Sequence, residues 1–198
     1  FSAKGVSITA LKYPVVLALV QSGLDVLLCD IDALLLGNPF MHIESETDIA
    51  FQRVAYFPRW IVMQWGFAAC SGFVYFRSNA AVIGFVKDCI LMNKLVISDQ
   101  FSLNLSLLKS NVQWDFVTEA RLEDNDTSGL HQEFLRMAGI GIRGKAIRPS
   151  LNIMALPHNT FWRHEWVPLQ GEKIIVAHPN SPKCDDGKIE TFRLRGFI

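Results

Sequence analysis

The sequence predicts an α/β fold in which helices and strands alternate along the chain. Half of the 198 residues are hydrophobic, so the chain can bury a large core. Short apolar or β-branched runs typical of strands are separated by longer segments of helical periodicity, and this alternation favours layers of helices on a sheet. The length suits a single domain over residues 1–198, with no internal repeat or low-complexity tract.

The first half of the chain begins with a helix followed by a strand. Residues 7–22 have roughly helical periodicity, Pro14 is expected in the first turn, and Gly23 is the stop signal. Residues 25–29 form a short apolar run next to an acidic residue, which is typical of a buried parallel strand. Further strands are expected at residues 48–53 and 72–77, and helices from Ser78 or Asn79 to Asn93 and from Ser98 or Asp99 to Leu108.

The second half is less regular. Residues 119–131 are the most polar stretch and indicate a surface loop, and the chain has a polar end. Trp65 and Trp162 lie outside any clear core element, so they are the tryptophans best suited to stack on the ring of a bound ligand. Strands are expected at residues 113–118, near 140–148 and at 173–177.

Charge and cysteine spacing argue against two classes of function. Lys+Arg and Asp+Glu number 19 each, so the formal net charge is zero, whereas a general nucleic-acid binder needs a basic surface. The four cysteines lie far apart, without a CxxC pair or Cys/His ligand spacing, so no zinc site is expected. The apolar run from Val15 to Cys29 is broken by polar residues and falls short of the roughly 18–20 residues of a membrane span. No span is therefore expected in this chain.

Asp30 and Asp32 form the first group of residues with chemical potential. If the preceding strand continued through them, their side chains would face the same side, about 6.6–6.8 Å apart. Ligands of open α/β sheets bind at the carboxyl ends of strands, and paired carboxylates suit a hard divalent cation. A solvent-facing strand end explains an isolated Asp-x-Asp equally well. Haloacid-dehalogenase-type phosphatases, in which the first aspartate is a nucleophile, and metal-dependent glycosyltransferases both carry such a pair after an apolar strand.

Four segments, taken in order, distinguish between these classes. The first runs from Lys12 through an apolar helix, Gly23, an apolar strand and Asp30-x-Asp32 to Phe40. The others are Ser71-Gly72-Phe73 through Arg77, Asp99-Gln100 with Leu103-Asn104, and His178-Pro179-Asn180 with Gly187-Lys188. Together they resemble the nucleotide-diphospho-sugar transferase family that includes plant and algal cell-wall arabinosyl- and xylosyltransferases. The resemblance spans essentially the whole chain.

The resemblance implies a GT-A fold, a Rossmann-type sandwich with a mixed, mostly parallel central sheet. In that fold a nucleotide-binding strand and helix precede the Lys12 helix, so the chain is expected to lack its N-terminal strand. The implied activity is metal-dependent and retaining transfer of a sugar from a nucleotide-diphosphate sugar, a UDP-sugar first of all, to a glycan or glycoprotein acceptor. The implied location is the Golgi lumen or secretory pathway.

The family motifs also imply roles for individual residues. Asp30, Asp32 and His178 resemble the ligands of Mn²⁺ or Mg²⁺, and a mixed oxygen and imidazole set suits Mn²⁺ somewhat better. Asp99 and Gln100 resemble the catalytic pair, with Asp99 on donor-sugar hydroxyls and Gln100 against the reacting face of the sugar. Residues implied to bind the substrate are Lys12, Ser71, Gly72, Asp99, Asn104 and Lys188.

Each of these roles has a plainer alternative. Asp99 is also a favoured residue at a helix start, and Asn104 is placed to brace Gln100 one turn earlier. Cys70 stands where the family has Asn, which keeps open a catalytically inactive, transferase-like binding module. In a haloacid-dehalogenase-type phosphatase Asp30 would be the nucleophile, but Leu34 replaces the Thr or Val favoured there.

Overall fold

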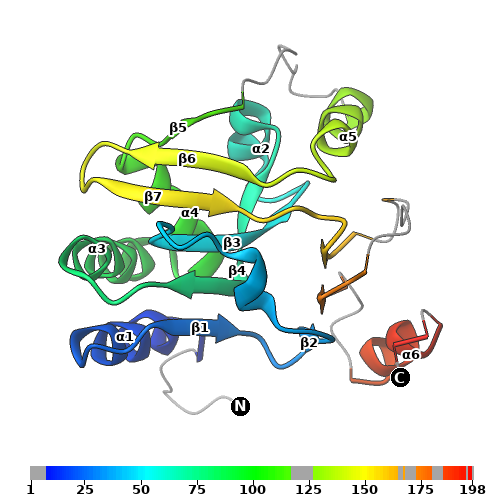
Figure 1. Cartoon of the computed structure of the whole chain (residues 1–198), viewed down its shortest axis with the longest axis horizontal. Helices are drawn as coiled ribbons and strands as arrows, with labels where there is room; N and C mark the ends of the chain where they lie inside the picture. Colours follow the sequence, from blue (N-terminus) through cyan, green and yellow to red (C-terminus); the bar gives the residue numbers. More distant parts are fainter. Residues whose placement is uncertain are drawn as a thin grey trace.

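The structure, a computed structural model, describes residues 8–116, 127–164, 167, 173–179, 185–194 and 196–197. Helices and strands alternate along it, so the predicted α/β class is confirmed (Figure 1). The helices are α1 (Ile8–Gln21), η1 (Pro39–His42), α2 (Arg59–Trp65), α3 (Ala80–Val96), α4 (Asp99–Lys109), α5 (Thr127–Arg136) and α6 (Asp185–Leu194). The strands are β1 (Val26–Cys29), β2 (Leu34–Leu35), β3 (Ile49–Val54), β4 (Ala68–Phe76), β5 (Gln113–Trp114), β6 (Ile142–Ala146), β7 (Leu151–Ala155), β8 (Phe161–Trp162) and β9 (Val176–Ala177).

The described strands form a six-stranded sheet and a three-stranded sheet. The large sheet has the order β1-β4-β3-β7-β6-β5, and the small one has the order β2-β9-β8. The large sheet is mixed, but among its described strands only β3 and β7 pair in parallel. The expectation of a mostly parallel sheet is therefore wrong. All nine residues of β4 are buried, and a strand covered on both faces has an unbroken apolar pattern whichever way its neighbours run.

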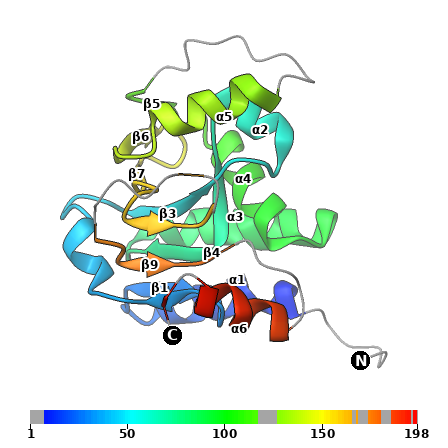
Figure 2. The same cartoon turned by 90° about the vertical axis from the view of Figure 1, so that its right-hand side faces the viewer.

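The large sheet lies between two layers, each with its own hydrophobic core. Helices α1, α3 and α4 cover one face, and the small sheet covers part of the other (Figure 2). Tyr13, Phe85 and Leu103 contribute to the helix-side core, whereas Phe73 and Phe161 contribute to the core beneath the small sheet. The described helices include none that is long and apolar enough to cross a membrane.

Strand β1 departs from its predicted environment. It lies at one edge of the described six-stranded sheet and is antiparallel to β4, with Val26 opposite Phe76 and Cys29 opposite Phe73. It is therefore not the buried parallel strand that its apolar sequence suggests. An apolar groove of about 390 Å³ runs between α1 and β1 and reaches Lys12 and Cys29. The expectation of a further strand before α1 stays a prediction.

Helix α1 tolerates a proline in its interior. Pro14 lies inside the helix, well past its first described turn, so the expected position is wrong. An interior proline removes one backbone donor and costs about 3 kcal/mol. The residues around it compensate, because Tyr13, Val16 and Val20 are all buried against the sheet and its helices.

Several elements fall where the sequence indicates irregular structure. Helix α2 forms where no element is expected, α5 begins inside the expected loop 119–131, and α6 occupies the polar end. Residues 117–126 lie outside the described residues, and the strand expected at 113–118 is described only as the two residues of β5. Trp65 is 7% exposed and Trp162 is 1% exposed. Both are core residues, so neither is available to stack on an acceptor sugar.

Candidate active site

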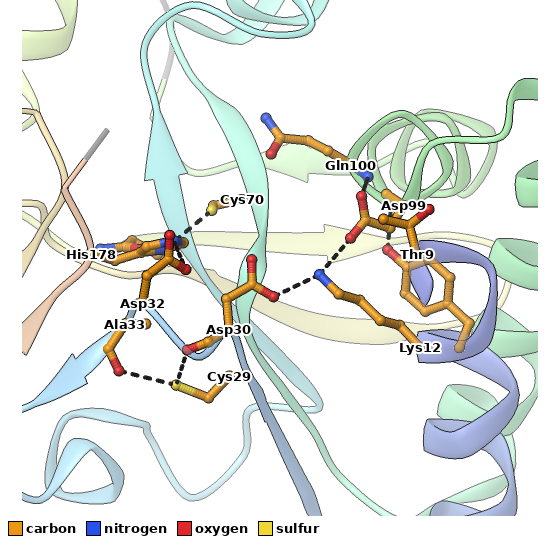
Figure 3. Close-up of polar contacts among 12 residues, drawn as sticks. Thr9, Lys12, Cys29, Asp30, Asp32, Ala33, Cys70, Asp99, Gln100 and His178 are labelled. Carbon is orange, nitrogen blue, oxygen red and sulfur yellow. Dashed lines mark hydrogen bonds and ion pairs between the residues drawn. The ribbon is translucent and has the colours of Figure 1, made fainter. Parts of the chain in front are cut away.

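The candidate site forms where the ends of β1, α4 and β9 lie close to the middle of β4. Strand β1 brings Asp30 and Asp32, β4 brings Gly72, the start of α4 brings Asp99 and Gln100, and the residue after β9 is His178. Lys12 reaches the same place from α1 (Figure 3). The structure thus brings together residues from all four segments that the sequence singles out.

The two aspartates converge through a turn. Strand β1 ends at Cys29, and the amide of Ala33 donates a 2.9 Å hydrogen bond to the carbonyl of Asp30. The predicted alternation along a continuing strand is therefore wrong, because the chain forms a turn at residues 30–33. The Asp30 amide donates to the carbonyl of Gly72 at 2.7 Å, which fixes the turn against β4.

His178 completes a group of three ligand-type side chains. Its Nε2 lies 3.4 Å from Oδ1 of Asp32, and its side chain is nearly inaccessible to solvent. One ligand atom from each of Asp30, Asp32 and His178 lies within 4.8 Å of the other two. Burial lowers the pKa of His178, but its contacts with Asp32 and Cys70 outweigh burial and raise the pKa above its usual value. Two carboxylates and an imidazole held this closely can bind a divalent cation.

Gly72 leaves no room for a side chain beside this group. A Cβ atom built on Gly72 would contact the His178 ring and would lie 2.5 Å from Oδ2 of Asp30. The absence of a side chain therefore lets Asp30 and His178 approach each other across β4. The neighbouring Ser71 is buried at 4% exposure, and its predicted contact with a donor stays a prediction.

Lys12 connects the aspartates of β1 and α4. Its ammonium donates to Oδ1 of Asp30 and to Oδ2 of Asp99, both at 2.6 Å. Burial lowers the pKa of Lys12, but the two carboxylates outweigh burial and raise the pKa above its usual value. Lys12 is therefore charged at neutral pH and holds the two acidic groups in one network.

The side chains of Asp99 and Gln100, at the start of α4, make different hydrogen bonds and point in different directions. Ser98 is the N-cap and accepts from the amide of Phe101, while Oδ1 of Asp99 accepts from the Gln100 amide at 2.8 Å. The Gln100 side-chain amide extends away from Lys12 (Figure 3) and donates to the carbonyl of Phe57 at 2.7 Å. The bond to Phe57 fixes the orientation of the Gln100 amide in this structure.

Comparison with known protein families decides the class of this site. The family described as nucleotide-diphospho-sugar transferase matches residues 2–192. The chain belongs to this family. Searches of curated proteins and of solved structures returned no significant match.

Family membership excludes one of the three alternatives drawn from the sequence. Residues 2–192 match the nucleotide-diphospho-sugar transferase family, and Asp30 and Asp32 lie directly after β1, where the resemblance implies an Asp-x-Asp pair. The haloacid-dehalogenase-type phosphatase is therefore wrong for this chain. Both an active transferase and an inactive relative are consistent with this membership.

Asn104 links α4 to β4 in this member of the family. It is fully buried, and its amide forms a two-point link with the backbone of Ala69, accepting from N–H and donating to C=O at 2.9 Å each. Its Nδ2 also donates to the Gln100 carbonyl at 2.8 Å. This bond fits the predicted brace on Gln100. The predicted substrate contact stays a prediction, and the side chain has no exposed surface in this structure.

Cys70 lies directly behind His178. Its Sγ is 3.9 Å from Nδ1 of the imidazole. Burial raises the pKa of the Cys70 thiol, but the charge of Arg163 and the contact with His178 outweigh burial and lower the pKa to about 7. Cys70 is 1% exposed, so a thiol here supports the imidazole from inside the fold.

Two residues of the site carried no signal in the sequence. Gln52 on β3 lies 3.1 Å from Nδ1 of His178, and Arg163 donates to the His178 carbonyl at 3.1 Å. Their segments have sequences typical of core strand or irregular chain. Both residues come close to His178 only through contacts between distant parts of the chain. The side chain of Lys188, within α6, and the whole of Asn180 lie outside the described residues.

Proposed function

We propose that this protein transfers a sugar from a nucleotide-diphosphate sugar, with a UDP-sugar as the first candidate donor, to a glycan or glycoprotein acceptor. The reaction uses a divalent cation and retains the anomeric configuration, and it takes place in the secretory pathway. The observation that carries the proposal is the convergence of Asp30, Asp32 and His178, whose ligand atoms lie within 4.8 Å of one another. The same three positions match the metal-binding residues that the family motifs imply.

The residues present fit such a cation. Two carboxylates and a nearly buried imidazole supply hard oxygen ligands and one nitrogen, a set that suits Mn²⁺ or Mg²⁺. Because Gly72 has no side chain, Asp30 and His178 can lie close together beside its backbone. A cation held there would neutralise negative charge on the diphosphate leaving group.

The chain's own residues supply the remaining parts of the reaction. Lys12 holds Asp30 and Asp99 in fixed positions through two bonds of 2.6 Å. Asp99 is thereby set to accept hydrogen bonds from donor-sugar hydroxyls. Gln100 follows on the same turn of α4, and rotation of its amide away from Phe57 would bring it to the reacting face of the sugar.

Turnover and binding are measured separately to test the proposal. The variant Asp32→Asn removes one carboxylate charge, and Asp88→Asn is the matched control, because Asp88 pairs with Lys109 on the surface at 2.7 Å. Release of UDP or GDP from a panel of nucleotide sugars is followed with and without Mn²⁺. We expect metal-dependent release by the wild type and by Asp88→Asn, and a loss of at least about 100-fold in Asp32→Asn. Undiminished turnover in Asp32→Asn contradicts the proposal.

The inactive binding module predicts a different result from the same proteins. A ligand present at about 100 times its dissociation constant stabilises the folded state by roughly 2.7 kcal/mol. Thermal stabilisation by Mn²⁺ with UDP or GDP, without release from any donor sugar, favours the inactive module. For an active enzyme, the anomeric configuration of the product, read by NMR, decides between retention and inversion.

A further inference from the structure

Gln52 occupies an irregular point of the large sheet. Strands β3 and β4 are in register at Phe51, opposite Val74, and again at Arg53, opposite Ala69. Residues 70–73 of β4 thus face a single residue of β3, which is Gln52. Such irregularities re-aim side chains near active sites. Here the same stretch contains Cys70 and Gly72, the two β4 residues that lie against His178.

The orientation of the Gln52 amide follows from its partners. Its Nε2 donates to the carbonyl oxygens of Phe161 and Trp162, at 3.1 and 3.0 Å. Carbonyl oxygens only accept hydrogen bonds, so the amide nitrogen must face them and Oε1 must face the other way. Gln52 is fully buried, at 0% exposure, so this orientation is not exchanged for contacts with water.

The orientation of Gln52 in turn determines which imidazole nitrogen of His178 carries a proton. Oε1 of Gln52 lies 3.1 Å from Nδ1 of His178, and an amide oxygen only accepts. Nδ1 therefore donates, because Oε1 of Gln52 at 3.1 Å is nearer than the Asp32 oxygen that faces Nε2 at 3.4 Å, and in the neutral imidazole Nε2 then keeps its lone pair. Nε2 is the nitrogen that faces Asp32. Nitrogen ligands of metals are commonly oriented in this way by a hydrogen bond on the opposite ring nitrogen.

We propose that Gln52 is the positioning residue that fixes the ring and tautomer of His178, so that Nε2 is presented to a cation held with Asp30 and Asp32. This inference rests on the proposed function, because it takes that cation site as given. Gln52 acts through His178 and does not itself contact the donor sugar. Its bonds to the carbonyls of Phe161 and Trp162 tie Gln52 to β8. The position of the small sheet and the orientation of the His178 ring are therefore fixed together.

The first test needs no variant. Long-range ¹H–¹⁵N NMR of the metal-free wild type, at a pH where His178 is neutral, reports which ring nitrogen is protonated. We expect the Nδ1–H tautomer. An Nε2–H tautomer overturns the proposal, whether or not any variant folds.

The second test measures Mn²⁺ affinity from the electron paramagnetic resonance signal of free Mn²⁺. We expect Gln52→Leu to weaken binding about 10–100-fold. Gln52→Glu, whose protonated carboxylic acid keeps a donor for a backbone carbonyl and an acceptor for Nδ1, should recover most of the affinity. Asn93→Leu is the matched control, because it removes another buried amide that donates to a backbone carbonyl, that of Thr9. It should leave Mn²⁺ affinity within about twofold.

The outcomes separate this inference from the proposed function. Unchanged Mn²⁺ affinity in a folded Gln52→Leu protein overturns the positioning role and leaves the transferase proposal standing. If Mn²⁺ affinities are as expected but the wild type transfers no sugar, the transferase proposal is contradicted and the positioning role of Gln52 stands. Failure of the wild type to bind Mn²⁺ at millimolar concentration overturns both, and the tautomer then describes only the metal-free fold.

Discussion

Lys12 and Asp99, 87 positions apart in the sequence, are joined by an ion pair of 2.6 Å. The side chains of Lys12 and Asp99 are only 17% and 13% exposed, so solvent screens this pair less than a surface pair. The same ammonium lies 2.6 Å from Asp30. One lysine therefore couples the aspartate that follows β1 to the aspartate that starts α4.

Replacing this lysine should affect both stability and turnover. Lys12→Met leaves Asp30 and Asp99 partly buried without their cation, so we expect a loss of about 1–3 kcal/mol in the free energy of unfolding at pH 7. We also expect loss of donor turnover in the folded protein. Urea unfolding and nucleotide release measure the two effects. Lys12→Arg, which keeps the charge, should recover more stability than turnover.

The pH dependence gives an independent check on the ion pair. The pKa of Lys12 is raised above its usual value of about 10.4. A raised pKa of a base stabilises the folded state at pH values below the unfolded pKa, and this contribution is lost as the pH rises through the folded pKa. The stability difference between wild type and Lys12→Met should therefore be constant from pH 7 to 9 and shrink above about pH 10.4. A difference that already declines between pH 7 and 9 would contradict the pairing.

Glycine at position 72 should be essential for the metal group. In Gly72→Ala the new Cβ would contact His178 and lie 2.5 Å from Oδ2 of Asp30, so one of the two side chains must move. We expect Mn²⁺ affinity to fall about 10–100-fold. Gly84→Ala is the control, because a Cβ there meets no atom within 4 Å and alanine favours a helix by up to about 1 kcal/mol. Equal Mn²⁺ affinity in the two variants would refute the steric argument.

Much of the candidate site could be predicted from local sequence. Asp30, Asp32, Asp99 and His178 each stand in a motif whose order matches the family, and the structure gathers them at one place. The local geometry could not be predicted, because the turn after Cys29 replaces the strand that would have carried Asp32. Gln52 carried no signal, because its contacts with His178 and with β8 span 109 residues or more.

The direction of the strands was the weakest part of the sequence prediction. An apolar run such as β1 or β4 indicates how much of the strand is buried. Whether the strand pairs parallel or antiparallel depends on connections far away in the sequence. The prediction that Trp65 and Trp162 are available for stacking was wrong for a related reason. Trp65 packs at 5.5 Å from Trp114 and Trp162 lies in the small sheet, and neither packing contact is visible in the residues next to them.

Asn104 should act on stability rather than on donor binding. Asn104→Ala leaves the N–H and C=O of Ala69 buried without their partners at 2.9 Å, so we expect a loss of about 2–4 kcal/mol in the free energy of unfolding. The KM for the donor, measured on the folded fraction, should stay within about twofold. A KM raised tenfold at unchanged stability would instead place Asn104 in contact with the substrate.

A buried histidine pair should make the fold sensitive to acid. His158 and His164 are 0% and 3% exposed, and their rings stack with centroids 5.6 Å apart. Nε2 of His158 accepts from the amides of Arg163 and His164, and Nε2 of His164 accepts from the amide of Ala55. Each bond requires an unprotonated Nε2, so both rings are neutral in the fold. Burial, reinforced by neighbouring positive charges, lowers the pKa of His158 to about 2 and that of His164 to about 3.

The sign of the pH effect follows from these lowered pKa values. In the unfolded chain each histidine takes up a proton near pH 6.5, whereas the folded chain excludes it. The free energy of unfolding should therefore fall as the pH drops below about 6.5, with a slope of up to about two protons from this pair. His164→Gln keeps an acceptor for the Ala55 amide and removes one titrating ring, so its slope between pH 6.5 and 4.5 should be about one proton smaller. Urea unfolding at half-unit pH steps measures both slopes, and parallel curves for the two proteins would show that His164 is protonated in the fold.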